Sequence, residues 1–227
     1  QSLSGYGMVR ANGGHGSQQP QQSGTGSGGR IAIHASMSSF NGSIQAYGGR
    51  TTEVVDRGQS GAAGTVYVVW GESRILTVDN GGYESQQTVV NESSGDLGLL
   101  RVVGSGKLAV VGGGEVGISG VEGDGSGSVS VMGGTTMTAL SSLNVSNCKL
   151  SVRDAMLGGV LDVSVLHGGE LALYENGRSV DAASVGVYNW SSLVVHDGGV
   201  VSVHSSSGES SLGVAVHSSA VHVLSGG

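Results

Sequence analysis

The apolar residues of the chain fall into short triplets in which two Val, Leu or Ile residues flank one further, usually small, residue. Alternation with a period of two is typical of a strand that buries one face. Six such triplets follow one another at a nearly constant spacing of about 21 residues. They are Leu108-Ala109-Val110, Val129-Ser130-Val131, Leu150-Ser151-Val152, Leu171-Ala172-Leu173, Leu193-Val194-Val195 and Val214-Ala215-Val216. A constant spacing of this length indicates a solenoid.

Further triplets lie between these six. One set follows the first by seven or eight positions and starts at Val116, Val201 and Val221, and another follows by 13 or 14 and starts at Leu143, Val163 and Val185. Three short strands in about 21 residues predict one coil of an all-β, single-stranded parallel β-helix. A single coil cannot bury its aliphatic side, so stacked coils form a continuous apolar column.

The N-terminal part repeats less regularly. Triplets start at positions 44, 66, 88 and 108, which is compatible with the same coil. Residues 12–29 are rich in Gly, Ser and Gln and contain the only proline, Pro20. We expect this segment to be a long loop that leaves the solenoid. The whole chain, 1–227, is then one continuous β-helix segment of a longer protein.

Composition agrees with this fold class. Glycine accounts for 44 of the 227 residues, which disfavours long helices because glycine costs about 1 kcal/mol against alanine inside a helix. Only 12% of residues are charged, and the steady supply of aliphatic residues disfavours disorder. The net charge is -7 and the ten Lys and Arg are scattered. We therefore expect no nucleic-acid partner, and no stretch approaches the roughly 20 apolar residues of a membrane span.

One part of the chain resembles a known class of protein. The segments are 28–33 (Gly-Gly-Arg-Ile-Ala-Ile), 41–49 (Asn-Gly-Ser-Ile-Gln-Ala-Tyr-Gly-Gly) and 61–68 (Gly-Ala-Ala-Gly-Thr-Val-Tyr-Val), and residues 7–14 look like an earlier copy of the unit at Asn41. They resemble glycine-rich repeat segments of very large extracellular parallel β-helix proteins of microbial eukaryotes and bacteria. The resemblance covers about residues 5–80. It implies a secreted, repetitive surface or fibre component and names no catalytic residues.

The outward positions of the best-defined sheet are chemically inert. The middle residues of the six triplets are Ala109, Ser130, Ser151, Ala172, Val194 and Ala215. None is a carboxylate, a base or a metal ligand, and no spacing forces the paired carboxylates that a glycosidase needs. The sequence therefore predicts a protein that is not an enzyme. The row is a flat, uncharged stripe, which favours packing against another sheet or subunit over a merely solvated face.

Candidate metal sites are weak. His196 and His217 are about one predicted coil apart and are expected to stack, and two imidazoles could bind a transition metal. A solvent-exposed ladder of like side chains is the simpler interpretation. Cys148 is the only cysteine and is expected to be a small core residue. We expect no cofactor and no metal.

Four N-glycosylation sequons start at Asn41, Asn91, Asn144 and Asn189. They are slightly more than chance predicts in a chain rich in serine, so we take them as candidate glycan sites, with chance as the alternative. The leading hypothesis is a structural extracellular glycoprotein, a segment of a filament, flagellar hair, cell wall or surface fibre that assembles as a homo-oligomer or with other fibre subunits. The alternatives are an adhesin-like module that binds a glycan or surface, and a carbohydrate-active β-helix enzyme.

Overall fold

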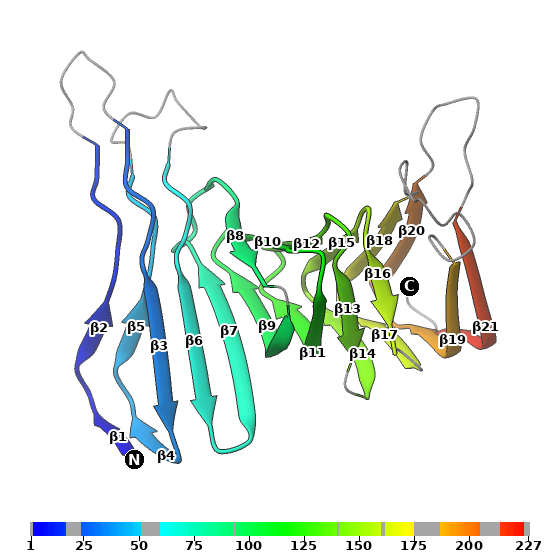
Figure 1. Cartoon of the computed structure of the whole chain (residues 1–227), viewed down its shortest axis with the longest axis horizontal. Coiled ribbons are helices and arrows are strands. Elements are labelled where there is room, and N and C mark those ends of the chain that lie inside the picture. The colour runs from blue at the N-terminus through cyan, green and yellow to red at the C-terminus, as the bar shows by residue number, and fades with distance from the viewer. Residues whose placement is uncertain are drawn as a thin grey trace.

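The computed structural model describes residues 2–16, 24–50, 60–92, 94–139, 141–159, 162–174, 187–204 and 214–224. This part of the chain is all-β and contains no helix (Figure 1), and therefore no helix that could cross a membrane. The strands are β1 (Ser2–Gly5), β2 (Met8–Arg10), β3 (Arg30–Ala35), β4 (Met37–Phe40), β5 (Ser43–Gln45), β6 (Thr65–Trp70), β7 (Ser73–Asp79), β8 (Thr88–Asn91), β9 (Ser94–Val103), β10 (Lys107–Val111), β11 (Glu115–Gly123), β12 (Ser128–Val131), β13 (Thr136–Ala139), β14 (Ser142–Ser146), β15 (Lys149–Val152), β16 (Met156–Gly158), β17 (Asp162–Leu166), β18 (Glu170–Tyr174), β19 (Val187–Val195), β20 (Val200–His204) and β21 (Ala215–Val223).

From β8 onward the chain passes back and forth between two parallel sheets. One has six strands in the order β20-β18-β15-β12-β10-β8. Within it Leu108, Val129, Leu150 and Leu171 lie side by side on four successive strands. All four are fully buried, because the period-two alternation turns every second residue of each strand toward the same core. The constant spacing that the sequence predicted is confirmed over this stretch.

The second sheet is longer and extends from β3 to β21, whereas β1 with β4 and β2 with β5 form two separate two-stranded sheets. Its main path is β21-β19-β17-β14-β11-β9-β7-β6-β3. The long strand β11 pairs with β13 along its first half and with β14 along its second half. The inward side chains of this long sheet, among them Val121 of β11 and Val145 of β14, meet those of the six-stranded sheet in one buried apolar column.

The N-terminal strands follow a different and longer repeat. Strands β1, β2 and β3 pair in parallel with β4, β5 and β6, and the offset along the chain is the same in all three pairs: Ser2 pairs with Met37, Val9 with Ile44, and Ile31 with Val66. The expected coil through positions 44, 66 and 88 is therefore wrong, because each N-terminal unit also contains two glycine-rich segments that lengthen it.

Those glycine-rich segments are packed against one another. Residues 11–16, 24–29, 46–50 and 60–64 are not strands, yet they are joined by backbone hydrogen bonds that link each segment to more than one other: Gly49 N donates to Gly26 O (2.8 Å), Gly61 N to Gly49 O (3.0 Å) and Gly13 N to Tyr47 O (2.8 Å). The backbones approach so closely that a Cβ atom on Gly49 or Gly64 would overlap a neighbouring carbonyl oxygen. Glycine is the residue that permits this approach. Residues 12–16 and 24–29 of the expected loop belong to this array, and residues 17–23 lie outside the described residues.

A hairpin joins the two repeat types. Strands β6 and β7 form the one antiparallel pair among the described strands. Val66 and Val68 of β6 belong to a small N-terminal core with Ala46, whereas Leu76 and Val78 of β7 belong to the large C-terminal core. The two cores thus lie on opposite faces of the same sheet, and the hairpin region is covered on both sides.

Candidate interaction face

The outer face of the six-stranded sheet carries a row of small residues along its middle. Its members pair directly with one another, strand after strand: Val89, Ala109, Ser130, Ser151, Ala172 and Ser202. Ala109 and Ala172 are almost fully covered by their neighbours, whereas Val89 at one end is half exposed. Four residues of the predicted row are therefore adjacent, as the spacing required.

The other two predicted members of this row lie elsewhere, which corrects the prediction. Val194 is in β19, paired with Ser164, and Ala215 is in β21, paired with Val187, so both belong to the long sheet. The strand that pairs with Leu171 contributes Val201, so this unit is longer than the one from Leu150 to Leu171. Extending the constant spacing past Leu171 therefore reaches a strand of the wrong sheet.

Charged side chains flank the row on one side. Lys149 and Glu170 lie on adjacent strands, and Lys149 Nζ is 2.6 Å from Glu170 Oε1. Both side chains are about one third exposed, and a pair this accessible to water contributes about 0–1 kcal/mol to stability. Ser202 Oγ also donates to Glu170 Oε1 at 3.4 Å. The pair cancels its own two charges, and the exposed Lys107, at the same position on β10, adds a positive charge to this border.

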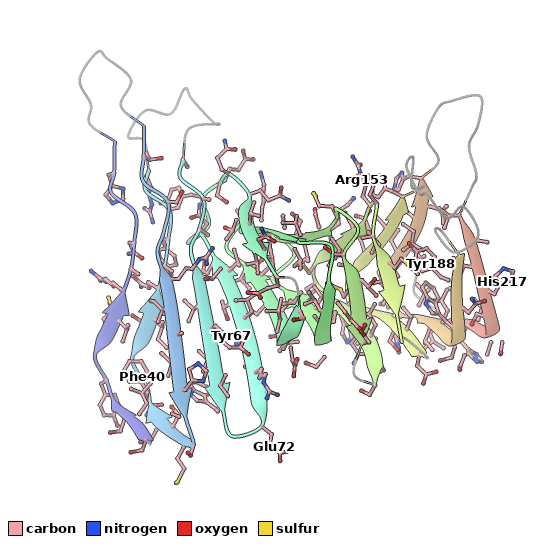
Figure 2. The ribbon with its side chains drawn as sticks, viewed as in Figure 1. Phe40, Tyr67, Glu72, Arg153, Tyr188 and His217 are labelled. Carbon is pink, nitrogen blue, oxygen red and sulfur yellow. The ribbon has the colours of Figure 1, made fainter. Side chains whose placement is uncertain are left out.

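A stacked column forms the other border. The guanidinium of Arg153 lies 4.3 Å from the ring centroid of Tyr174, and the Tyr174 and His204 rings stack at 4.5 Å with 12° between their planes. Figure 2 shows Arg153 at the surface of the molecule. Cation–π contacts at such exposed sites contribute about 0.5–1 kcal/mol each. His204 of β20 is the direct neighbour of Tyr174 in this column.

The structure separates the two histidines that were expected to stack. His217 lies on β21 (Figure 2) opposite Asn189, and His196 follows β19, where its N–H donates to Val165 O. The neighbour of His196 on the next strand is Leu224, whose N–H donates to Val195 O. The expectation that His196 and His217 stack on adjacent strands is therefore wrong. In the described part of the chain no group of three or more His, Cys, Asp or Glu side chains could hold a metal ion.

Cys148 lies in the C-terminal core and is 2% exposed. Burial raises the pKa of its thiol to about 12, mainly because the thiolate would lose its hydration. The thiol therefore stays protonated at neutral pH and is a poor nucleophile.

All four sequon asparagines have exposed side chains. Asn41 lies between β4 and β5, Asn144 and Asn189 lie on the outer face of the long sheet, and Asn91 lies on the outer face of the six-stranded sheet beside Val111. Exposure leaves room for a glycan at each position. A glycan on Asn91 would stand at one end of the small-residue row.

Two features of this surface were missed by reasoning from sequence. Ser202 belongs to the small-residue row and His204 to the stacked column, but neither was predicted there. The chain between β18 and β20 is longer than the constant spacing, so that spacing does not lead to these two residues. Pairing of Leu171 with Val201 could have been found by matching the apolar alternation while allowing the connection to vary in length.

Comparison of the chain with protein-family models, with curated proteins and with solved structures gives no match.

Proposed function

We propose that this chain is a structural, non-catalytic segment of an extracellular fibre or surface layer, folded as a parallel β-helix with three strands in each coil. The observation that carries the proposal is the outer face of the six-stranded sheet. Its central row contains no acid, base or metal ligand, and its borders carry an ion pair on one side and a stacked column on the other. Such a face suits contact with another sheet better than chemistry.

The strand edges of β20 and β21 also support assembly. These strands are outermost among the described strands of their sheets, and their inward valines continue the buried rows but are exposed, Val203 by 51% and Val223 by 69%. An apolar edge with unpaired backbone groups is a template for a further strand. A second copy, or further coils of the same protein, would cover it.

Glycosylation completes the proposal. We propose that the protein is secreted and that glycans occupy the exposed sequons at Asn41, Asn144 and Asn189, which point away from the six-stranded face. Asn91 is the exception, because a glycan there would limit lateral contact at that end of the row.

The packing face is tested by one charge placed in its middle. Ser151 and Ser164 are both half-buried serines on outer faces of β-strands, but only Ser151 lies in the small-residue row. The wild-type chain, made by a secretory host, is expected to form elongated oligomers in sedimentation and electron microscopy. Ser151→Arg is expected to shift the population to monomers, whereas Ser164→Arg leaves it unchanged, with equal thermal unfolding as the check on folding. Wild-type protein that stays monomeric at high concentration, or equal effects of both variants, contradicts the proposal.

A further inference from the structure

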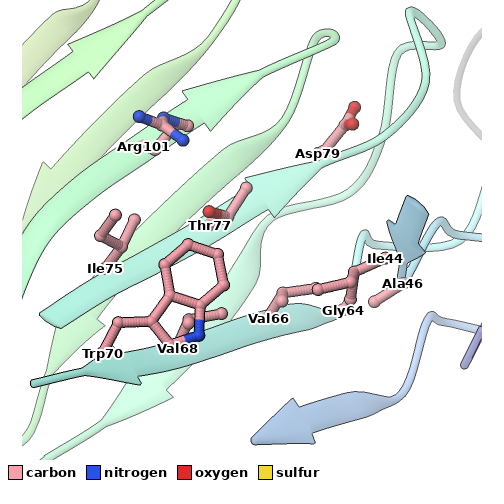
Figure 3. A pocket seen from close by; sticks show the side chains of 10 residues that line it. All are labelled: Ile44, Ala46, Gly64, Val66, Val68, Trp70, Ile75, Thr77, Asp79 and Arg101. Carbon is pink, nitrogen blue, oxygen red and sulfur yellow. The ribbon is translucent and has the colours of Figure 1, made fainter. Parts of the chain in front are cut away.

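A cavity lies where the N-terminal repeat ends against the hairpin. Its volume is about 170 Å³, and it is lined by Ile44 and Ala46 at the end of β5, by the Val66, Val68 and Trp70 face of β6, and by Ile75, Thr77, Asp79 and Arg101 on β7 and β9. Figure 3 shows the β6 and β7 side chains on one face of the sheet, with Ile44 and Ala46 at the far end. A cavity of about 150 Å³ is large enough to hold a benzene ring. The space therefore matches one six-membered ring.

The cavity has a topological cause. Strand β5 pairs with β2, and no described strand pairs with its other edge, because after β6 the chain turns back into β7 instead of starting a third N-terminal unit. At one end β7 meets the glycine-rich array, where Gly48 N donates to Asn80 Oδ1 at 2.8 Å.

The lining is amphipathic. Val66, Val68 and Ile75 make an apolar wall beside the Trp70 indole, whereas Thr77, Asp79 and Arg101 supply a hydroxyl, an acceptor and a donor. Both charged groups already have partners in the protein, because Arg101 Nε is ion-paired with Glu122 Oε1 and Asp79 Oδ1 accepts from Gly81 N. The Nε1–H of Trp70 is buried and has no hydrogen-bond partner. Buried indole N–H groups usually find an acceptor, so this donor is available to an oxygen that enters the cavity after a small movement of the ring.

These features narrow the class of occupant. A purely apolar molecule would leave the Thr77, Asp79 and Arg101 groups desolvated, and a charged one would meet a like charge at Asp79 or Arg101. A docked peptide strand is disfavoured because β5 has only three residues and Gly48 N, shortly after it, already donates to Asn80 Oδ1. A neutral ring with one apolar face and several hydroxyls satisfies both sides, and its C–H groups suit the electron-rich face of the indole.

We propose that this cavity binds one neutral hexopyranose ring, with the apolar face of the sugar against Trp70 and its hydroxyls toward Thr77, Asp79 and Arg101. The site lies on the outer face of the long sheet, away from the small-residue row, so it does not depend on the assembly proposed above. It would give a fibre subunit a point of attachment to a neutral glycan.

Binding is measured with the whole chain in whatever oligomeric state it adopts, by calorimetry and by tryptophan fluorescence, against the methyl glycosides of glucose, galactose and mannose. At least one is expected to bind saturably with a dissociation constant on the order of 1 mM, as for a single small ring. Trp70→Ala is expected to weaken binding at least tenfold. Trp190→Phe is the matched control, because Trp190 lies in the C-terminal core and does not line the cavity.

A second variant guards against a folding artefact. Thr77→Val keeps the shape of the side chain and removes one hydroxyl, and a several-fold loss of affinity is expected with unchanged circular dichroism. Cyclohexanol and an extended peptide of alternating Val and Thr serve as competing ligands. The proposal is overturned if none of the three glycosides binds, if cyclohexanol or the peptide binds more tightly than the sugars, or if Trp190→Phe weakens binding as much as Trp70→Ala.

Discussion

At the scale of single residues, burial of polar atoms without partners is the unusual feature of this chain. Tyr188 and Trp190 are neighbours in the C-terminal core, 3% and 4% exposed, with ring centroids 5.8 Å apart. The Tyr188 hydroxyl and the Trp190 Nε1–H have no hydrogen-bond partner. An unsatisfied buried donor costs about 1–3 kcal/mol, so these aromatic rings must stabilise the core by their apolar area.

We predict that Tyr188 makes the protein sensitive to alkali. Burial raises the pKa of its hydroxyl to about 12, above the ordinary value near 10. The folded state therefore favours the neutral phenol: this contribution is complete below about pH 10 and is lost as the pH rises toward 12. Tyr188→Phe removes the titrating group and the unsatisfied oxygen together.

Urea unfolding at pH 8 and at pH 11 measures the effect. The free energy of unfolding should fall less between the two pH values in Tyr188→Phe than in the wild type, and at pH 8 the variant should be at least as stable. The exposed Tyr83→Phe is the control and should behave as wild type. A variant that is less stable at pH 8, with the same fall toward pH 11, would show that the hydroxyl has a partner.

At the scale of elements, the four glycine-rich segments form a unit without being a sheet. They are held by backbone hydrogen bonds between segments that are distant in sequence, such as Gly64 N to Ala46 O at 2.6 Å and Gly28 N to Ala62 O at 2.9 Å. Side chains contribute at the margins: Tyr47 N donates to Asn12 Oδ1, and the Arg50 guanidinium lies 3.6 Å from the Tyr83 ring centroid. The glycines are therefore packing residues here, as well as turn residues.

Gly49→Ala and Gly14→Ala test the packing role, because Gly49 is crowded by neighbouring backbone and Gly14 is not. A Cβ atom on Gly49 would overlap the carbonyl oxygen of Gly14, whereas a Cβ atom on Gly14 meets nothing within 4 Å. We expect Gly49→Ala to destabilise the N-terminal unit by about 1–3 kcal/mol, because backbone segments must move apart. Gly14→Ala should be neutral or stabilising by up to about 1 kcal/mol, since alanine restricts the unfolded chain. Protection of backbone amides in residues 24–50 from hydrogen exchange reports the difference, and equal protection in both variants would contradict the packing role.

At the scale of the whole molecule, two cores of unequal size share one sheet. The N-terminal core is built on the buried side chains of Ala46, Val66 and Val68, whereas the C-terminal core is a continuous column through many strands. Each strand pairs only with its neighbours in the sheet, so we expect stability to add from strand to strand along the sheet. The hairpin β6–β7 is the boundary, because it turns a different face to each core.

We predict that the two cores unfold separately. Trp70 reports the N-terminal unit and Trp190 the C-terminal one, so each tryptophan can be observed alone in the Trp190→Phe or Trp70→Phe variant. Trp70 fluorescence should change at a lower urea concentration than Trp190 fluorescence, because fewer apolar contacts hold its unit. A single coincident transition in both variants, matched by circular dichroism, would mean that the hairpin couples the cores into one cooperative unit.

The sequence by itself determined the all-β class, the parallel stacking rows and the buried residues of the C-terminal column. Leu108, Val129, Leu150 and Leu171 could be aligned from sequence because the period-two pattern and the constant spacing are both local properties that repeat without interruption. The same reasoning identified Ala109, Ser130, Ser151 and Ala172 as one row on the outer face.

Only the tertiary structure decided which strands are neighbours where the connections vary. Ser202 and not Val194 continues the row, and Val66 pairs with Ile31 and not with Thr88, because a strand pairs with whichever backbone edge lies beside it, whatever length of chain connects the two. The glycine-rich array and the cavity beside Trp70 have the same origin. Both form where segments from separate repeats approach in space, and a pattern read along one chain carries no signal for that approach.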